Sequence, residues 1–161
     1  MIEAVFKKGI VSLNERDYQK LFSKGFGEKV EKLFTLNYFE TLFLLENKKI
    51  KIEDFEFNTF LKKSKVDYKE YLVFKDLTKK GHNVKSGIRF GTTFRIYKKG
   101  TQIKKDHAQW LVDVKKYTSK LSLNDFASKN RIANTTNKKL LIAVVDLEDD
   151  ITYFETSWFK P

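Results

Sequence analysis

The run "KKLLIAVVD", residues 138–146, constrains the fold of this chain more than any other stretch. Its apolar part is continuous and has the length of a strand. A strand that lacks polar alternation is apolar on both faces, so other elements must cover both of its sides. We therefore predict a central strand in a sheet that is packed on both faces.

The segments around this run complete a layered domain. The stretch "HAQWLVDVKKY" alternates with period two around Trp110, which predicts a half-buried strand. The stretch "SLNDFASKNRIAN" predicts a helix with Ser122 as N-cap and Asp125 three residues later. The stretch "ITYFETSWF" predicts a last strand. Residues 67–161 are therefore expected to form an α/β sandwich.

Residues 1–66 have a more helical pattern. Residues 1–13 predict one or two short strands broken at Gly9, and "KIKI" predicts another. Helices are predicted for "NERDYQKLFSKG", capped by Asn14, for "TLNYFETLFLLENKK", capped by Thr35 or Asn37, and for "EDFEFNTFLKKSK". The helix "DYKEYLVFKDLTKKG" opens the second part. The predicted class is α/β of the α+β kind, with a small helix-rich N-terminal α/β domain at 1–66 and a strand-rich domain at 67–161.

The stretch "RFGTTFRIYKKG", residues 89–100, predicts a strand with two different faces. Counting by twos separates an apolar set, Phe90, Phe94 and Ile96, from a second set, Arg89, Thr93, Arg95 and Tyr97. The first face suits a core. The second carries two guanidinium groups and ends in a tyrosine before a Lys-Lys-Gly turn, which raises the question of what a cationic strand needs a phenol for.

The net charge of +11 is concentrated in the middle of the chain, where residues 69–120 hold 14 Lys and Arg against four Asp and Glu. Basic charge confined to one segment predicts a nucleic-acid partner, and a solvated lysine-rich surface is the alternative. The chain has no cysteine, no stretch typical of a signal peptide and no window of eighteen apolar residues. We therefore expect a cytoplasmic protein without a membrane partner.

Metal catalysis fits the basic segment poorly, because beyond its first helix it holds only Asp106 and Asp113 as carboxylates. RNA can be cut without a metal, since its 2′-hydroxyl is a built-in nucleophile that needs a base, an acid and a cation. Tyr97, His107 and a lysine at the head of the apolar run are candidates for these roles. Singly each signal is weak, because tyrosines at strand ends usually pack at interfaces and a lone histidine is usually an ordinary surface residue.

Four stretches of the chain carry a resemblance to a known family. The catalytic domain of archaeal tRNA-splicing endonucleases resembles "YLVFKDLTKKGHNVKSGIRFGTTFRIYKKG", "HAQWLVDV" and "SLNDFASKNRIANTTNKKLLIAVVDLEDDITYFETSW". The family's N-terminal region resembles "LFTLNYFETLFLLENKKIKIED". The tyrosine of the "FG…F.IY" strand, the histidine ten residues later and the lysine heading "KLLIAVVD" occur in the family's order. For residues 67–161 the resemblance implies a restriction-endonuclease-like α/β sandwich with a mixed sheet.

The resemblance also implies a catalytic triad that uses neither metal nor cofactor. Tyr97 would be the general base, His107 the general acid, and Lys138 would stabilise the transition state. Lys139 is the alternative to Lys138, and because neighbours on a strand point to opposite faces, only one of them can meet Tyr97. A phenol is a weak base near neutral pH, so cations such as Arg95 and Lys138 are needed to favour its anionic form.

The substrate implied by the resemblance is precursor tRNA with a bulge-helix-bulge at its intron junctions, cut by transesterification to a 2′,3′-cyclic phosphate and a 5′-hydroxyl. Arg131, seven residues before Lys138, matches the arginine that clamps a splayed bulge base. Trp158 is the first choice for its stacking partner and Tyr153 the second. Core packing is the alternative for Trp158. Arg95, on the cationic face, is a further expected RNA contact.

An acidic turn, Asp146, Glu148, Asp149 and Asp150, follows the apolar run. It can be an ordinary solvated turn. A loop at this place in the family resembles a plug that enters a basic pocket on a neighbouring subunit. We therefore expect assembly into a homotetramer, or into a heterotetramer with a separate structural subunit.

Two other functions remain compatible with the residues. The first is a metal-dependent DNA nuclease of restriction-enzyme-like fold, with Asp146, Glu148 and Asp149 as metal ligands. The second is a non-catalytic RNA-binding structural subunit. A purely structural copy would need none of the three matched side chains, which favours the endonuclease.

Overall fold

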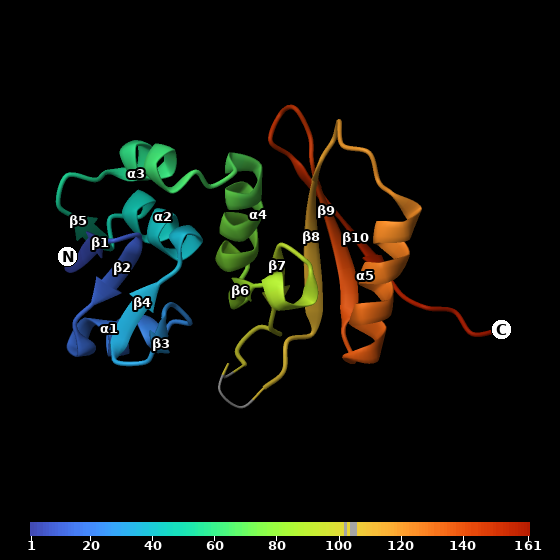
Figure 1. Cartoon of the computed structure of the whole chain (residues 1–161), viewed down its shortest axis with the longest axis horizontal. Coiled ribbons are helices and arrows are strands. Elements are labelled where there is room, and N and C mark those ends of the chain that lie inside the picture. Colours follow the sequence, from blue (N-terminus) through green and yellow to red (C-terminus); the bar gives the residue numbers. More distant parts are fainter. Residues whose placement is uncertain (102, 104–105) are drawn as a thin grey trace. The chain divides into compact units, whose positions relative to one another are not determined.

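The structure is a computed structural model that describes residues 1–101, 103 and 106–161 (Figure 1). The chain divides into two compact units, Met1–Tyr68 and Lys69–Pro161. Each unit contains its own five-stranded mixed sheet, so the predicted α+β class is confirmed. No helix in the described part of the chain is long and apolar enough to cross a membrane.

The N-terminal unit has the strand order β3-β4-β2-β1-β5. Its strands are β1 (Ile2–Lys7), β2 (Ile10–Leu13), β3 (Glu28–Val30), β4 (Leu33–Leu36) and β5 (Ile50–Ile52), and its helices are α1 (Glu15–Phe22), α2 (Tyr38–Glu46) and α3 (Phe57–Ser64). The predicted caps are confirmed, because Asn14 accepts a hydrogen bond from the amide of Asp17 and Asn37 forms a capping box with Glu40.

The hairpin β3–β4 was missed by the sequence pattern. Leu36 shares a helical stripe with Phe39 and Phe43 in the sequence, yet it ends β4 and pairs with Val11 of β2. Asn37 is the N-cap and α2 begins at Tyr38, so Leu36 lies outside the helix and does not belong to its apolar stripe. A left-handed turn at Glu31, with φ 54°, joins the two strands.

The C-terminal unit has the strand order β10-β9-β8-β7-β6. Its elements are α4 (Tyr68–Lys79), β6 (Val84–Ser86), the 3₁₀ turn η1 (Ile88–Phe90), β7 (Phe94–Ile96), β8 (Trp110–Lys116), α5 (Leu123–Thr135), β9 (Lys139–Val145) and β10 (Ile151–Thr156). The apolar run forms β9, which pairs in parallel with β8 and antiparallel with β10. The predicted central strand is therefore confirmed.

The two helices of this unit cover opposite faces of its sheet (Figure 1). On one face, Ala133 of α5 forms a buried cluster with Leu111 and Leu140. On the other, Phe74 of α4 lies with its ring centroid 5.9 Å from that of Phe94. As a result β8 is buried on both faces, where the sequence predicted a strand buried on only one.

The predicted strand from residue 89 is wrong in its first half. Ile88–Phe90 form the 3₁₀ turn, and Gly91 follows in the left-handed region with φ 72°. This turn resets the alternation, so Phe90 packs on the α5 cluster while Phe94 faces α4. Phe90 therefore lies on the face of the cationic residues, opposite to the prediction.

Candidate functional site

Three strand ends meet at one edge of the C-terminal sheet. The pairing runs from Ile96 of β7 to Trp110 of β8 and on to Lys139 of β9. One step further out, the amide of Gln109 donates to the carbonyl of Ile96 at 2.9 Å, and the amide of Lys139 donates to the carbonyl of Gln109 at 3.0 Å. The next row at this end of the sheet therefore contains Tyr97, Gln109 and Lys138.

Side-chain alternation separates the two candidate lysines. Lys139 lies on the face of Trp110, where its Nζ is 3.1 Å from Oε1 of Glu155 and the indole N–H of Trp110 donates to Oε2 at 2.8 Å. These hydrogen bonds, that from Trp110 first, lower the pKa of Glu155. Lys138 lies on the opposite face, with its Nζ 5.2 Å from the ring centroid of Phe90.

Lys138 belongs to a cluster of cations on the α5 face. Burial is the largest cause that lowers its pKa, followed by the positive charges of Arg95 and then Arg89. The ammonium group donates to the carbonyl of Thr136 at 3.0 Å. Arg95 is two residues before Tyr97 and hydrogen-bonds the carbonyl of Ser86 at 3.2 Å. Positive charges gathered at a half-buried position favour the binding of a phosphate group.

The pKa of Lys138 is expected to rise toward the ordinary range when Arg95 is changed to Gln, because a neighbouring positive charge that disfavours the ammonium form is removed. A lysine is charged below its pKa, so Lys138 in the unchanged chain should lose its proton at lower pH than exposed lysines. Titration of the lysine Cε signals by NMR, with Lys138→Arg to assign the signal, measures both shifts. Arg131→Gln is the control, and an unchanged Lys138 midpoint in Arg95→Gln would contradict the electrostatic cause.

Tyr97 and His107 occupy different environments near this row. Tyr97 directly follows β7 and is only 6% exposed, and continuing the alternation of β7 by one residue puts it on the face of Arg95. His107 is exposed and lies two residues before Gln109, in the segment that leads into β8. The fold thus brings the backbone of all three candidate residues to one edge of the sheet. Contact of their side chains with one phosphate stays a prediction.

The candidate base clamp lies beside the same edge. Trp158 is 47% exposed and lines a pocket of about 300 Å³ together with Lys138, Lys139 and Asn134 of α5. Core packing of Trp158 in the last strand is therefore wrong. Arg131 is exposed on α5, three residues before Asn134 and outside the residues that line the pocket.

Tyr153 does not share this surface. Its hydroxyl donates to Oδ2 of Asp76 on α4 at 2.7 Å, and the Nζ of Lys80 lies 5.3 Å from its ring centroid. Burial and the hydrogen bond to Asp76 raise the pKa of Tyr153 far above its ordinary value. Tyr153 therefore faces α4, on the side of the sheet away from Arg131, and the second choice for the clamp is wrong.

The acidic turn between β9 and β10 is organised by its own side chains. Oδ1 of Asp146 accepts the amides of Glu148 at 2.8 Å and Asp150 at 3.0 Å. Asp149 pairs with Lys69, which also donates to the carbonyl of Asp146 at 2.9 Å. Nowhere among the described residues do three His, Cys, Asp or Glu side chains form a group that could hold a metal ion. This arrangement gives no support to Asp146, Glu148 and Asp149 as metal ligands.

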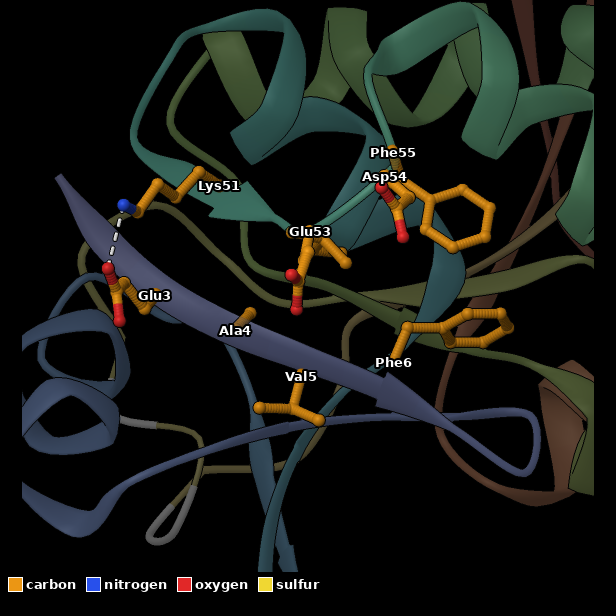
Figure 2. A pocket seen from close by; sticks show the side chains of 9 residues that line it. Glu3, Ala4, Val5, Phe6, Lys51, Glu53, Asp54 and Phe55 are labelled. Carbon is orange, nitrogen blue, oxygen red and sulfur yellow. Dashed lines mark ion pairs between the residues drawn. The ribbon is translucent and has the colours of Figure 1, made fainter.

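A larger pocket, of about 560 Å³, lies in the N-terminal unit between β1, β5 and the turn that follows β5. Figure 2 shows Glu3 and Lys51 paired at its rim, with 2.7 Å between Oε1 and Nζ, and the side chains of Glu53 and Asp54 nearby. Three carboxylates against one ammonium group disfavour an RNA phosphate at this pocket. The candidate site is therefore the cationic edge of the C-terminal sheet.

Sequence reasoning missed His82 and Asn83 at this edge. Both hydrogen-bond the backbone of Tyr97, His82 through Nδ1 at 2.9 Å and Asn83 through its carbonyl at 3.1 Å. The only local signal is their position, directly after Gly81, where a helix was expected to end and a hairpin to begin. Such a signal does not reveal which residue of the hairpin they contact.

Comparison with known proteins covers both units. The family described as "tRNA intron endonuclease, catalytic C-terminal domain" matches residues 68–153, and "tRNA intron endonuclease, N-terminal domain" matches residues 2–61. A tRNA-splicing endonuclease of Thermococcus kodakarensis is 33% identical over 160 residues, which cover 94% of each chain. That of Pyrococcus furiosus is 36% identical over 146 residues, which cover 86% of this chain and 84% of the relative. That of Methanothermobacter thermautotrophicus is 34% identical over 143 residues, which cover 84% of each chain.

Proposed function

We propose, from the premise that this chain belongs to the tRNA intron endonuclease family, that it cuts precursor tRNA at the bulge-helix-bulge junctions of an intron. Relatives named tRNA-splicing endonuclease cover nearly the whole chain, which supports an RNA endonuclease that acts in tRNA splicing. The finer proposal is a metal-independent transesterification carried out by Tyr97, His107 and Lys138.

In the proposed reaction the 2′-oxygen at the junction attacks the adjacent phosphorus. The 2′-hydroxyl proton passes to the phenolate oxygen of Tyr97 as the bond between phosphorus and the 2′-oxygen forms. The bond between phosphorus and the 5′-oxygen breaks, and the imidazolium of His107 gives its proton to that leaving oxygen. The ammonium group of Lys138 stabilises the extra negative charge on the phosphorane. The products are a 2′,3′-cyclic phosphate and a 5′-hydroxyl.

One observation carries this proposal: Tyr97 and Lys138 fall in one row at the end of the sheet, on the face that holds Arg95 and Arg89. The positive charges on this face can stabilise the negative charge that develops on the phosphorane. The same charges attract the scissile phosphate. The chemistry therefore needs no group beyond side chains that the chain itself supplies.

Incubation of the purified chain with an intron-containing precursor tRNA in EDTA tests the proposed function. Two cuts at the junctions, with cyclic phosphate and 5′-hydroxyl ends, are the expected result. Cleavage that requires added Mg²⁺ and leaves 5′-phosphates would contradict the mechanism. Tight RNA binding without any cleavage, alone or with a second subunit, would favour the non-catalytic structural role.

For the substrate contacts we propose that Arg131 and Trp158 hold a splayed bulge base, with Arg95 on the phosphate backbone. The exposed indole of Trp158 beside the pocket of about 300 Å³ supports a stacking role. Base stacking on an aromatic side chain contributes ~1–3 kcal/mol per base. Trp158→Ala should therefore weaken binding of the RNA substrate more than it slows cleavage at saturating enzyme.

For the assembly we propose that the acidic turn binds a basic surface of another subunit, in a homotetramer or a heterotetramer. Glu148 and Asp150 are the acids to change, because Asp146 and Asp149 make the contacts that hold the turn. Changing both Glu148 and Asp150 to Lys should lower the assembly mass measured by light scattering, and salt should weaken the unchanged assembly. Glu31→Lys with Glu53→Lys is the charge-matched control. A mass that is insensitive to salt and to the turn variant would argue against this role.

A further inference from the structure

His82 is one of two histidines in the chain and is not part of the proposed triad. It follows Gly81, which ends α4 in the left-handed region with φ 92°, and its amide donates to the carbonyl of Leu77 at 3.1 Å. Its ring Nδ1 lies 2.9 Å from the backbone carbonyl oxygen of Tyr97. Because a carbonyl oxygen only accepts, Nδ1 must carry the proton of this hydrogen bond.

Asn83 makes a second hydrogen bond to the backbone of Tyr97. Its carbonyl accepts the amide of Tyr97 at 3.1 Å, and its side-chain Nδ2 donates to the carbonyl of Thr101 at 3.2 Å. Both backbone groups of Tyr97 are therefore bound to the pair His82–Asn83. Through its side chain, Asn83 also contacts Thr101, in the lysine-rich segment that follows Tyr97.

The imidazole of His82 is itself held in place by packing. The ring of Trp110 meets it edge-on, with 5.9 Å between ring centroids and an interplanar angle of 85°. The indole N–H of Trp110 is fixed by its 2.8 Å hydrogen bond to Glu155, which also pairs with Lys139. This chain of contacts lies on the Trp110 face and meets Tyr97 at its backbone carbonyl.

Tyr97 needs such an attachment because it lies just outside a strand. β7 ends at Ile96, and beyond this end the hydrogen bonds to Asn83 and His82 hold the amide and the carbonyl of Tyr97 and so help to aim the phenol. A displacement of a reacting group by about 1 Å can lower a rate ~10²-fold. We propose that His82 is a positioning residue for Tyr97, which holds its carbonyl through Nδ1 and thereby aims the phenol toward the face of Lys138. This inference rests on the proposed function.

Three substitutions at residue 82 separate the hydrogen bond from simple packing. Leu fills the space and cannot donate, Asn places an N–H where Nδ1 lies, and Gln places one nearer to the position of Nε2. We expect His82→Leu and His82→Gln to lower the single-turnover cleavage rate constant ~10-fold at saturating enzyme, with RNA affinity unchanged. We expect His82→Asn to cleave within ~3-fold of the unchanged chain, because it keeps the donor. Equal rates for the Leu and Asn variants, whether both fast or both slow, would overturn the proposal.

Two measurements on the protein without RNA keep this test separate from the proposed function. Long-range ¹H–¹⁵N NMR should show the Nδ1–H tautomer for His82, and the Nε2–H tautomer would overturn the hydrogen bond. Amide hydrogen exchange at Tyr97 should accelerate in His82→Leu and not in His82→Asn; equal exchange in both would also overturn it. A chain that cuts no precursor tRNA would refute the proposed function, while these two measurements would still decide whether His82 holds Tyr97.

Discussion

Replacing Tyr97 with Phe, or His107 with Ala, should each lower the single-turnover cleavage rate constant ~10²-fold or more, since each removes one proton-transfer group of the proposed reaction. Tyr97→Phe deletes only the phenolic oxygen, and the buried ring, 6% exposed, keeps its packing. RNA binding and the thermal unfolding midpoint should therefore change little in that variant. The measurement is cleavage of a labelled precursor tRNA with enzyme in excess.

Tyr117→Phe is the matched control, because Tyr117 is 68% exposed and lies just beyond the last residue of β8, away from the edge that carries Tyr97. Its rate should equal that of the unchanged chain. If Tyr97→Phe also cleaved at that rate, Tyr97 would be removed from the mechanism. If only His107→Ala were slow, a base other than the phenol would have to be sought among the groups on the α5 face.

Lys138→Ala should lower the cleavage rate constant ~10²-fold, because the proposed transition state loses the cation that faces the phosphorane. Lys139→Ala should stay within ~3-fold of the unchanged chain, since Lys139 lies on the face away from Tyr97. Its pair with Glu155 is exposed, and exposed pairs contribute little to stability. The two variants differ by one position on one strand, so each is the control of the other. A slow Lys139 variant beside a fast Lys138 variant would reverse the assignment.

Some features of the fold can be predicted from short segments of the sequence alone. The apolar run of residues 138–146 predicted a central strand covered on both faces, because a strand without polar alternation has no side that suits water. Ser122 predicted the start of α5, because its hydroxyl can satisfy a free amide at a helix terminus. Both are local relations between neighbouring residues.

Other features depend on residues that are distant in the chain. Leu36 was assigned to a helix because its apolar neighbours repeat at helical spacing, but pairing with Val11 placed it in a strand. Phe90 was assigned to the wrong face because a left-handed residue at Gly91 resets the alternation, and the one-letter pattern shows no such break. Tyr153 was the second choice for the clamp, but its hydrogen bond to Asp76 places it on the other face of the sheet.

By itself, then, the sequence determined most of the elements, the layered class of the C-terminal unit and the family, since caps, periodicity and motifs are local; the β3–β4 hairpin and the 3₁₀ turn at Ile88–Phe90 escaped it. Only the tertiary structure decided that Lys138 and not Lys139 shares the face of Arg95, and that His82 reaches the backbone of Tyr97. The physical reason is strand register. Which residues of β7, β8 and β9 lie opposite one another depends on how whole strands pair and pack, and each shift of one residue moves every side chain to the other face.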